Sequence, residues 1–213
     1  MIMETVQKRF GSLIKVKPEY EERYIILHKY TFPAVLKQIH DSNIRNYSIF
    51  LRDGVLFSYF EYIGKDFEED MSHMAEDEAT RDWWRLTDPM QEPFETRKKG
   101  EWWASLDEVL HFGEKQVPSY QAQRHAFVAS AEYAKPAASF EPEASGLILQ
   151  NLTAFHLDSK IYLYLEDAGL ASNRQPESFK AILQSLLQHL TLLSGCTEWH
   201  TLREVFHFDN ENY

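Results

Sequence analysis

The sequence of 213 residues has very little cysteine: Cys196 is the only one. An intrachain disulfide and a cysteine-rich metal site are therefore excluded. The sequence also lacks any apolar run of about 18 residues, the length that a membrane-spanning helix needs. Residues 1–10 are polar and do not have the apolar core of a signal peptide. We therefore expect a cytoplasmic protein that does not associate with a membrane.

Positive charge is scarce as well. The chain has 22 lysines and arginines against 33 aspartates and glutamates, which gives a formal net charge of −11. Binding of nucleic acid requires clustered basic side chains, and the longest basic run here covers only residues 97–99. Glycine-rich phosphate loops, a Gly-x-Ser-x-Gly motif and metal-binding histidine spacings are also missing. We therefore expect no nucleic-acid partner and no metal site.

What the sequence does contain is an internal repeat. Residues 46–64 match residues 151–169 at six identical positions, and residues 103–112 match residues 199–208 at six of ten positions. A weaker match of residues 9–14 to residues 124–129 precedes both in the same order. This order favours a duplication, with a first half at residues 1–113, a linker at residues 114–123 and a second half at residues 124–213.

The matched segments have the alternation of strands, and Asp53-Gly54 is a strong signal for a hairpin turn between two of them. The first half places helical patterns between them, over about residues 18–39 with a break or kink at Pro33, and over residues 67–86. Each copy is thus predicted to be a ferredoxin-like β-α-β-β-α-β unit of the α+β class. Two such copies could form an intrachain pseudo-dimeric α+β barrel.

The second copy is predicted to be degenerate, with shortened helices. Pro136, Pro142 and Gly146 fall where the first copy has its first helix. The second copy also has no equivalent of the paired Tyr24 and His28 of the first copy. We therefore expect one active site per chain, in the first half.

Tyr24 and His28 are spaced by one helical turn and project from the same helix face. An aromatic-proline pair follows at positions 32 and 33, then an Asn-Tyr pair and a Trp-Trp pair. These motifs, in this order, resemble those of the L-rhamnose mutarotase family over about residues 8–113. The motif residues are Tyr24, His28, Phe32, Asn46, Tyr47, Trp83 and Trp84.

This resemblance implies an aldose mutarotase, an isomerase of carbohydrate metabolism that needs no cofactor. It would interconvert the α and β anomers of a free deoxy sugar, with L-rhamnose as the first candidate. The resemblance implies that Tyr24 and His28 are catalytic and that the other five motif residues contact the sugar. Opening a pyranose ring needs one proton donor and one proton acceptor, for which a tyrosine and a histidine are suited.

Several alternatives stay open at this point. Asn46 could cap a turn instead of binding sugar, because its counterpart Asn151 persists in the second copy. Only one of the two rings of Trp83 and Trp84 is expected to touch a ligand. A sugar-binding protein without turnover, or another small cofactor-independent enzyme of the same barrel type, would fit the same fold. The chain could be a monomer or a homodimer.

Overall fold

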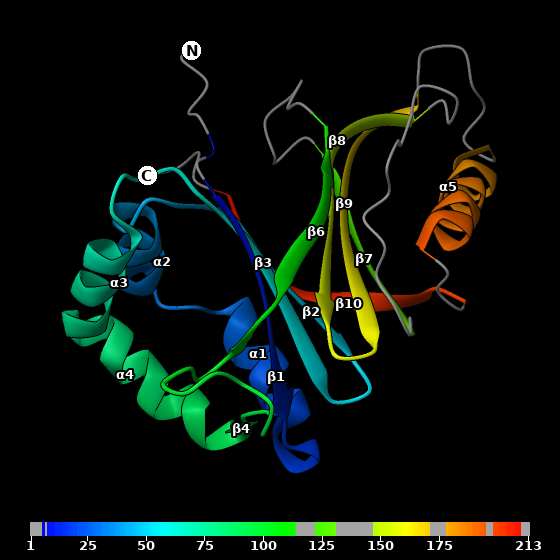
Figure 1. Cartoon of the computed structure of the whole chain (residues 1–213). Helices are drawn as coiled ribbons and strands as arrows, with labels where there is room; N and C mark the ends of the chain where they lie inside the picture. Colours follow the sequence, from blue (N-terminus) through cyan, green and yellow to red (C-terminus); the bar gives the residue numbers. More distant parts are fainter. Residues whose placement is uncertain are drawn as a thin grey trace. The chain divides into compact units, whose positions relative to one another are not determined.

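The computed structural model describes residues 6, 8–113, 122–130, 147–170, 178–194 and 198–209. Its elements divide into two compact units (Figure 1). Unit 1 combines Met1–Leu106 with Arg203–Tyr213, and unit 2 is Asp107–Leu202. Most of the predicted linker, residues 114–121, and residues 131–146, where we predicted the loss of a helix, lie outside the described part of the chain.

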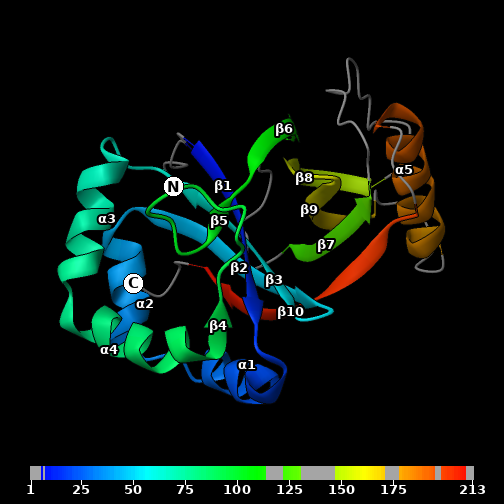
Figure 2. The ribbon, with the colours of Figure 1, turned by 60° about the horizontal axis from the view of Figure 1, so that its bottom comes forward.

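Unit 1 is an antiparallel sheet with helices on one of its faces. The strands follow the order β4-β1-β3-β2-β10, and β5 also pairs with β1. Figures 1 and 2 show α1 to α4 gathered on one side of β1, β2 and β3. The elements are β1 (Lys8–Val16), η1 (Pro18–Tyr20), α1 (Glu21–Lys29), α2 (Pro33–Asp41), β2 (Ile44–Arg52), β3 (Val55–Tyr62), α3 (Phe67–Glu76), α4 (Glu78–Thr87), η2 (Asp88–Met90), β4 (Gln91–Glu92) and β5 (Ala104–Ser105).

Unit 2 repeats part of this plan. Its strands pair in the antiparallel order β7-β9-β8-β6, and α5 packs its apolar side chains against them. The elements are β6 (Asp107–Phe112), β7 (Gln123–Ser130), β8 (Leu147–Leu157), β9 (Lys160–Leu170) and α5 (Ser178–Ser194), followed by the start of β10 (His200–Phe208). None of the helices that the structure describes is long and apolar enough to cross a membrane.

The last strand of each sequence copy pairs, wholly or in part, outside its own copy. β6 ends the first copy but pairs with β8 in unit 2, whereas residues 203–208 of β10 end the second copy and pair with β2 in unit 1. The compact units therefore differ from the two sequence copies by one strand each. The α+β class and the strand and helix order predicted for the first copy are confirmed. The pairing of the copies into a barrel stays a prediction.

The hairpins show why the two copies match in sequence. Asp53 and Asp158 each occupy the tight turn after their strand with φ of 50° and 53°. Aspartate tolerates this left-handed conformation better than most residues, and Gly54 continues it with φ of 72°. The matched aspartates thus fix the register of β2 with β3 and of β8 with β9.

The helices of unit 1 break at residues that cannot continue them. Pro33 stands at the first turn of α2, so the helical pattern over residues 18–39 is divided as predicted. The single helix predicted over residues 67–86 was wrong, because Asp77 separates α3 from α4. Asp77 has an extended backbone, and its carboxylate accepts a hydrogen bond from the Thr80 amide at 2.7 Å. It therefore caps α4, and the chain restarts there.

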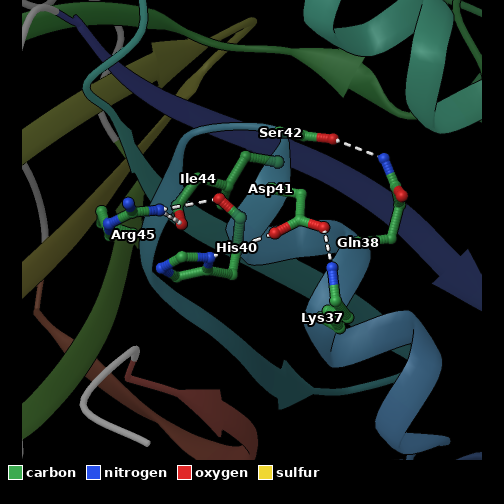
Figure 3. Close-up of polar contacts among 7 residues, drawn as sticks. All are labelled: Lys37, Gln38, His40, Asp41, Ser42, Ile44 and Arg45. Carbon is green, nitrogen blue, oxygen red and sulfur yellow. Dashed lines mark hydrogen bonds and ion pairs between the residues drawn. The ribbon is translucent and has the colours of Figure 1, made fainter. Parts of the chain in front are cut away.

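The C-terminal end of α2 is held by polar side chains (Figure 3). Arg45 donates from Nη1 to the carbonyl oxygens of His40 at 3.0 Å and Ile44 at 2.9 Å. Lys37 forms an ion pair with Asp41 on the same helix. The guanidinium group thus adds a side-chain partner to one of the last carbonyl groups of α2, that of His40. This capping fixes the turn from α2 into β2.

Each unit has its own core. In unit 1 the buried residues of α1, α2 and α4 pack on β1, β2 and β3, together with Val205, Phe206 and Phe208 of β10. In unit 2, Ile182, Leu186 and Leu190 of α5 pack on the strands. The C-terminal strand is thus part of the core of unit 1.

Phe208→Ala should lower the free energy of unfolding by about 3 kcal/mol or more, the usual range for a buried phenylalanine. Its ring is 6% exposed and belongs to the core of unit 1. Urea unfolding followed by circular dichroism measures the change. Arg203→Ala, in the same strand but exposed, is the control and should change stability little. Equal effects of both variants would contradict the role of β10 in this core.

Candidate active site

Helix α1 presents Tyr24 and His28 one turn apart on the side that faces the sheet. The two rings stack with centroids 4.0 Å apart and an angle of 28° between their planes. The two residues are 1% and 8% exposed. Because α1 covers the core of unit 1, the i, i+4 spacing places both titratable groups where little water reaches them.

The protonation of His28 follows from its contacts. Its Nδ1 lies 2.9 Å from the carbonyl oxygen of Tyr24. A carbonyl oxygen can only accept, so Nδ1 carries the proton and Nε2 is the acceptor of the ring. Burial lowers the pKa of His28 to about 4, and the ring is neutral at pH 7. Because the unfolded chain binds this proton more readily, the stability that the neutral ring provides is lost as the pH falls from about 6.5 toward 4.

Tyr24 keeps its proton for a similar reason. Burial raises the pKa of its phenol well above the ordinary value, and the neighbouring Tyr47 adds to the rise. A hydrogen bond from Gln91 Nε2 to the phenol oxygen at 3.3 Å acts in the opposite direction. At neutral pH the site therefore holds a protonated phenol beside a neutral imidazole.

A cavity of about 250 Å³ opens beside these two rings. This is slightly below the range of about 300–1,000 Å³ that is common for drug-sized ligands, so it suits a smaller molecule. The wall combines aromatic rings with a few polar groups, which is typical of sites for small polar ligands. The residues that line it are Tyr24, His28, Tyr47, Ile49, Trp83, Trp84, Thr87, Asp88, Gln91, Trp102 and Trp103.

Five of the seven residues predicted for the site lie together in this wall: Tyr24, His28, Tyr47, Trp83 and Trp84. The two tryptophans differ in their exposure. Trp83 is buried and meets the His28 ring edge to face at 5.1 Å, whereas Trp84 is 37% exposed. Both tryptophans line the cavity, and the expectation that only one of the two rings touches a ligand stays a prediction.

Phe32 and Asn46 are not brought to the cavity wall. Phe32 packs edge to face on Trp83 at 5.4 Å but does not line the cavity. Asn46 is buried in an irregular part of β2, with φ of 49°, and donates from Nδ2 to Oε1 of Glu61 at 3.2 Å. The alternative of a structural role for Asn46 fits this placement.

Six wall residues were missing from the predicted site, and three of them had some sequence signal. Thr87 and Asp88 follow the Trp-Trp pair closely, and Trp103 opens one of the repeated segments. Gln91 carried no signal, because it reaches the site through the pairing of β4 with β1. Burial raises the pKa of the Asp88 carboxyl.

Phe206 supports the site from the C-terminal end of the chain. Its ring meets His28 at 5.7 Å and Tyr47 at 5.4 Å, both edge to face. Residue 206 reaches them because β10 pairs with β2 within unit 1. A residue of the second sequence copy thus packs against two cavity-wall residues of the first copy.

Two histidines at equivalent positions of the two sequence copies, His111 and His207, lie in strands. His207 Nδ1 is 2.8 Å from the Ser48 hydroxyl, and His111 Nδ1 is 2.9 Å from the Thr153 hydroxyl. These equivalent contacts join β10 to β2 and β6 to β8. Among the residues that the structure describes, no group of three or more acidic, histidine or cysteine side chains gathers as a metal site would require.

Comparison with known proteins shows the family of the chain. Residues 9–112 match the model of the L-rhamnose mutarotase family. The L-rhamnose mutarotase of Oceanobacillus iheyensis is 32% identical over 83 residues, which are 39% of this chain and 79% of that protein. The chain belongs to the L-rhamnose mutarotase family. The L-rhamnose mutarotase of Ligilactobacillus salivarius is 30% identical over 89 residues, 39% of this chain and 80% of that protein. The resemblance found in the sequence is thereby confirmed, and family membership supports a mutarotase function.

Solved structures agree on the fold. A proposed monooxygenase of Fusobacterium nucleatum has a TM-score of 0.52 at 11% identity, and the match covers 98% of this chain and 100% of that one. A proposed monooxygenase of Lactobacillus acidophilus has a TM-score of 0.50 at 12% identity, with 95% and 97% covered. At such low identity the likeness shows the α+β fold and carries nothing about activity.

The His28 ring should stay neutral well below pH 6.5. Nitrogen-15 NMR of labelled histidine should show the Nδ1-protonated tautomer at pH 7 and a titration midpoint near pH 4, in line with its pKa. His40, on the surface of α2 with its ring partly exposed, is an internal comparison within the same spectrum. A midpoint for His28 near 6.5, or an Nε2-protonated tautomer at pH 7, would contradict the described site.

Proposed function

We propose that this chain is an aldose mutarotase that interconverts the α and β anomers of a free deoxy sugar, with L-rhamnose as the first candidate. The observation that carries the proposal is the stacked pair of a protonated Tyr24 phenol and a neutral His28 imidazole in the cavity wall. This pair offers one donor and one acceptor side by side, in a chain of the mutarotase family.

Mutarotation needs two proton transfers. The ring opens when its oxygen O5 gains a proton, the anomeric hydroxyl loses one, and the bond between C1 and O5 breaks to leave an aldehyde. Rotation about the bond from C1 to C2 and closure on the other face of the aldehyde return both protons. No oxidant, reductant or strong nucleophile takes part, so an acid and a base at the right positions suffice. We assign these two roles to Tyr24 and His28.

The other wall residues suit a small sugar. The apolar face of a pyranose can pack on the rings of Trp83 and Trp84, and its hydroxyls can bond to the polar ends of neighbouring side chains. Tyr47 presents a phenol whose pKa is raised to about 12 by burial, so it is available as a hydrogen-bond donor at pH 7. Thr87 and Asp88 add a hydroxyl and a carboxyl to the same wall.

We further propose that each chain has a single such site, in unit 1, and that its partner is the sugar substrate. The aligned segments of the second copy offer no Tyr-x-x-x-His and no tryptophan pair in the sequence. The net charge of −11 fits a neutral substrate better than an anionic one, because like charges repel.

Saturation-transfer NMR between the two anomers tests the proposal directly. The protein should accelerate exchange of L-rhamnose, or of a related deoxy sugar such as L-fucose, above the rate in buffer. His28→Ala and Tyr24→Phe should each reduce the acceleration about 100-fold or more, since general acid-base groups contribute about 10²–10⁴-fold. Both variants must retain the wild-type circular dichroism spectrum for the comparison to hold.

His40→Ala is the matched control, because His40 lies on α2 and is not part of the cavity wall. Its exchange rate should equal that of the wild type. Binding of sugar without faster exchange would favour a sugar-binding protein instead. No effect on any deoxy sugar tested would contradict the proposal and favour another reaction of this fold.

A further inference from the structure

Gln91 lies between the phenol of Tyr24 and the indole of Trp102. It is 5% exposed and opens the short strand β4, where it pairs with Val16 of β1. Its Oε1 is 2.7 Å from Nε1 of Trp102, and its Nε2 is 3.3 Å from the phenol oxygen of Tyr24. A side-chain amide with a defined partner at each end is held in one orientation.

The chemistry of the indole decides what that orientation is. The indole nitrogen carries a hydrogen and can only donate, so the amide atom that faces it must be the oxygen. The NH₂ end of Gln91 must therefore face Tyr24 and donate to the phenol oxygen. Exchanging the two ends would oppose two donors at 2.7 Å and leave the Trp102 N–H group without its acceptor.

This bond constrains the phenol. Because its oxygen accepts from Gln91, the hydrogen of the phenol points elsewhere, and Tyr24 is itself a wall residue of the cavity. The same bond would strengthen if negative charge developed on the oxygen, since a hydrogen bond to an ion is about twice as strong as one between neutral groups. Gln91 thus prepares Tyr24 to lose a proton.

We propose that Gln91, fixed by Trp102, is a positioning residue that makes Tyr24 the proton donor to the ring oxygen and leaves His28 as the base at the anomeric hydroxyl. This inference rests on the function proposed above. The role of His28 follows from its own geometry, because its Nδ1 is committed to the Tyr24 carbonyl oxygen and only Nε2 can accept.

The step balances within the site. Nε2 of His28 takes the proton of the anomeric hydroxyl while the Tyr24 phenol gives its proton to O5. The bond from C1 to O5 breaks and the C1 carbonyl forms, leaving an imidazolium ion and a phenolate ion. Ring closure on the other face returns one proton to each group. No other reactant is needed.

Burial works against this ion pair, which explains why a donor to the phenolate is needed. Burial lowers the pKa of His28 and raises that of Tyr24, so both charged forms are disfavoured. The Gln91 bond lowers the pKa of Tyr24 and so opposes part of that effect. A preorganised donor of this kind acts mainly on the transition state, where the charge develops.

Gln91→Met tests the inference, because methionine keeps the length and removes both polar ends. We expect kcat for anomer exchange to fall about ten- to a hundredfold, the range for a bond to a charged group, with KM nearly unchanged. Trp102→Phe, which removes the orienting N–H group together with part of the ring, should give a smaller fall in kcat. In a Tyr24→Phe background, Gln91→Met should cause little further loss, because Gln91 acts through the phenol.

Gln38→Met is the matched control, since Gln38 bonds to Ser42 at the end of α2, and its kcat should equal that of the wild type. Wild-type kcat in Gln91→Met, or full additivity with Tyr24→Phe, would overturn the inference. If the wild-type protein itself fails to accelerate exchange, the proposed function has failed instead.

The bonding pattern can be measured without turnover. The Trp102 indole proton should shift in Gln91→Met, and a Gln91 amide proton should shift in Tyr24→Phe, because each loses its acceptor. Thermal unfolding verifies that the variants are folded. If either resonance stays in place in a folded variant, the orientation of Gln91, and with it the inference, is overturned.

Discussion

Removal of water from two stacked rings, Tyr24 and His28, governs the chemistry of the cavity. Burial keeps the imidazole neutral and the phenol protonated, so that a base and an acid coexist at neutral pH. The surrounding elements maintain this state. Helix α4 places Trp83 against the imidazole edge, the α1 backbone fixes the tautomer through the Tyr24 carbonyl oxygen, and β4 brings an amide to the phenol. Loss of any of these contacts would admit water or rotate a ring.

The C-terminal strand connects this site to the end of the chain. β10 pairs with β2, and Phe206 packs against His28 and Tyr47 from within the core of unit 1. The second sequence copy lacks the tyrosine-histidine pair, yet its last strand completes the sheet on which the first copy's site depends. The last strand of the second half is therefore required for packing in unit 1. The low exposure of Phe208, 6%, agrees with that requirement.

Much of the fold could be predicted from the sequence because it depends on local patterns, and the residues at the centre of the candidate site were predicted from the family resemblance. The Asp53-Gly54 turn, the break at Pro33 and the one-turn spacing of Tyr24 and His28 are local features, and each has the predicted structure. The division of the second helix at Asp77 was missed, since its capping bond competes with helix propensity. Gln91 and Phe206 could not be predicted, because strand pairing brings them to the site from distant positions. Phe32 and Asn46 were predicted for the site but do not line the cavity. A sequence motif places a residue near the site without deciding whether its side chain faces the cavity.

The central claim is that Tyr24 and His28 act on the two reacting oxygens of one sugar in this cavity. A crystal structure of the protein with bound L-rhamnose, or with whichever deoxy sugar exchanges fastest, tests it most directly. We predict a pyranose against Trp83 and Trp84, with its ring oxygen within hydrogen-bond distance of the Tyr24 phenol and its anomeric hydroxyl facing Nε2 of His28. A sugar bound elsewhere, or bound here with both oxygens out of reach of these two groups, would contradict the account.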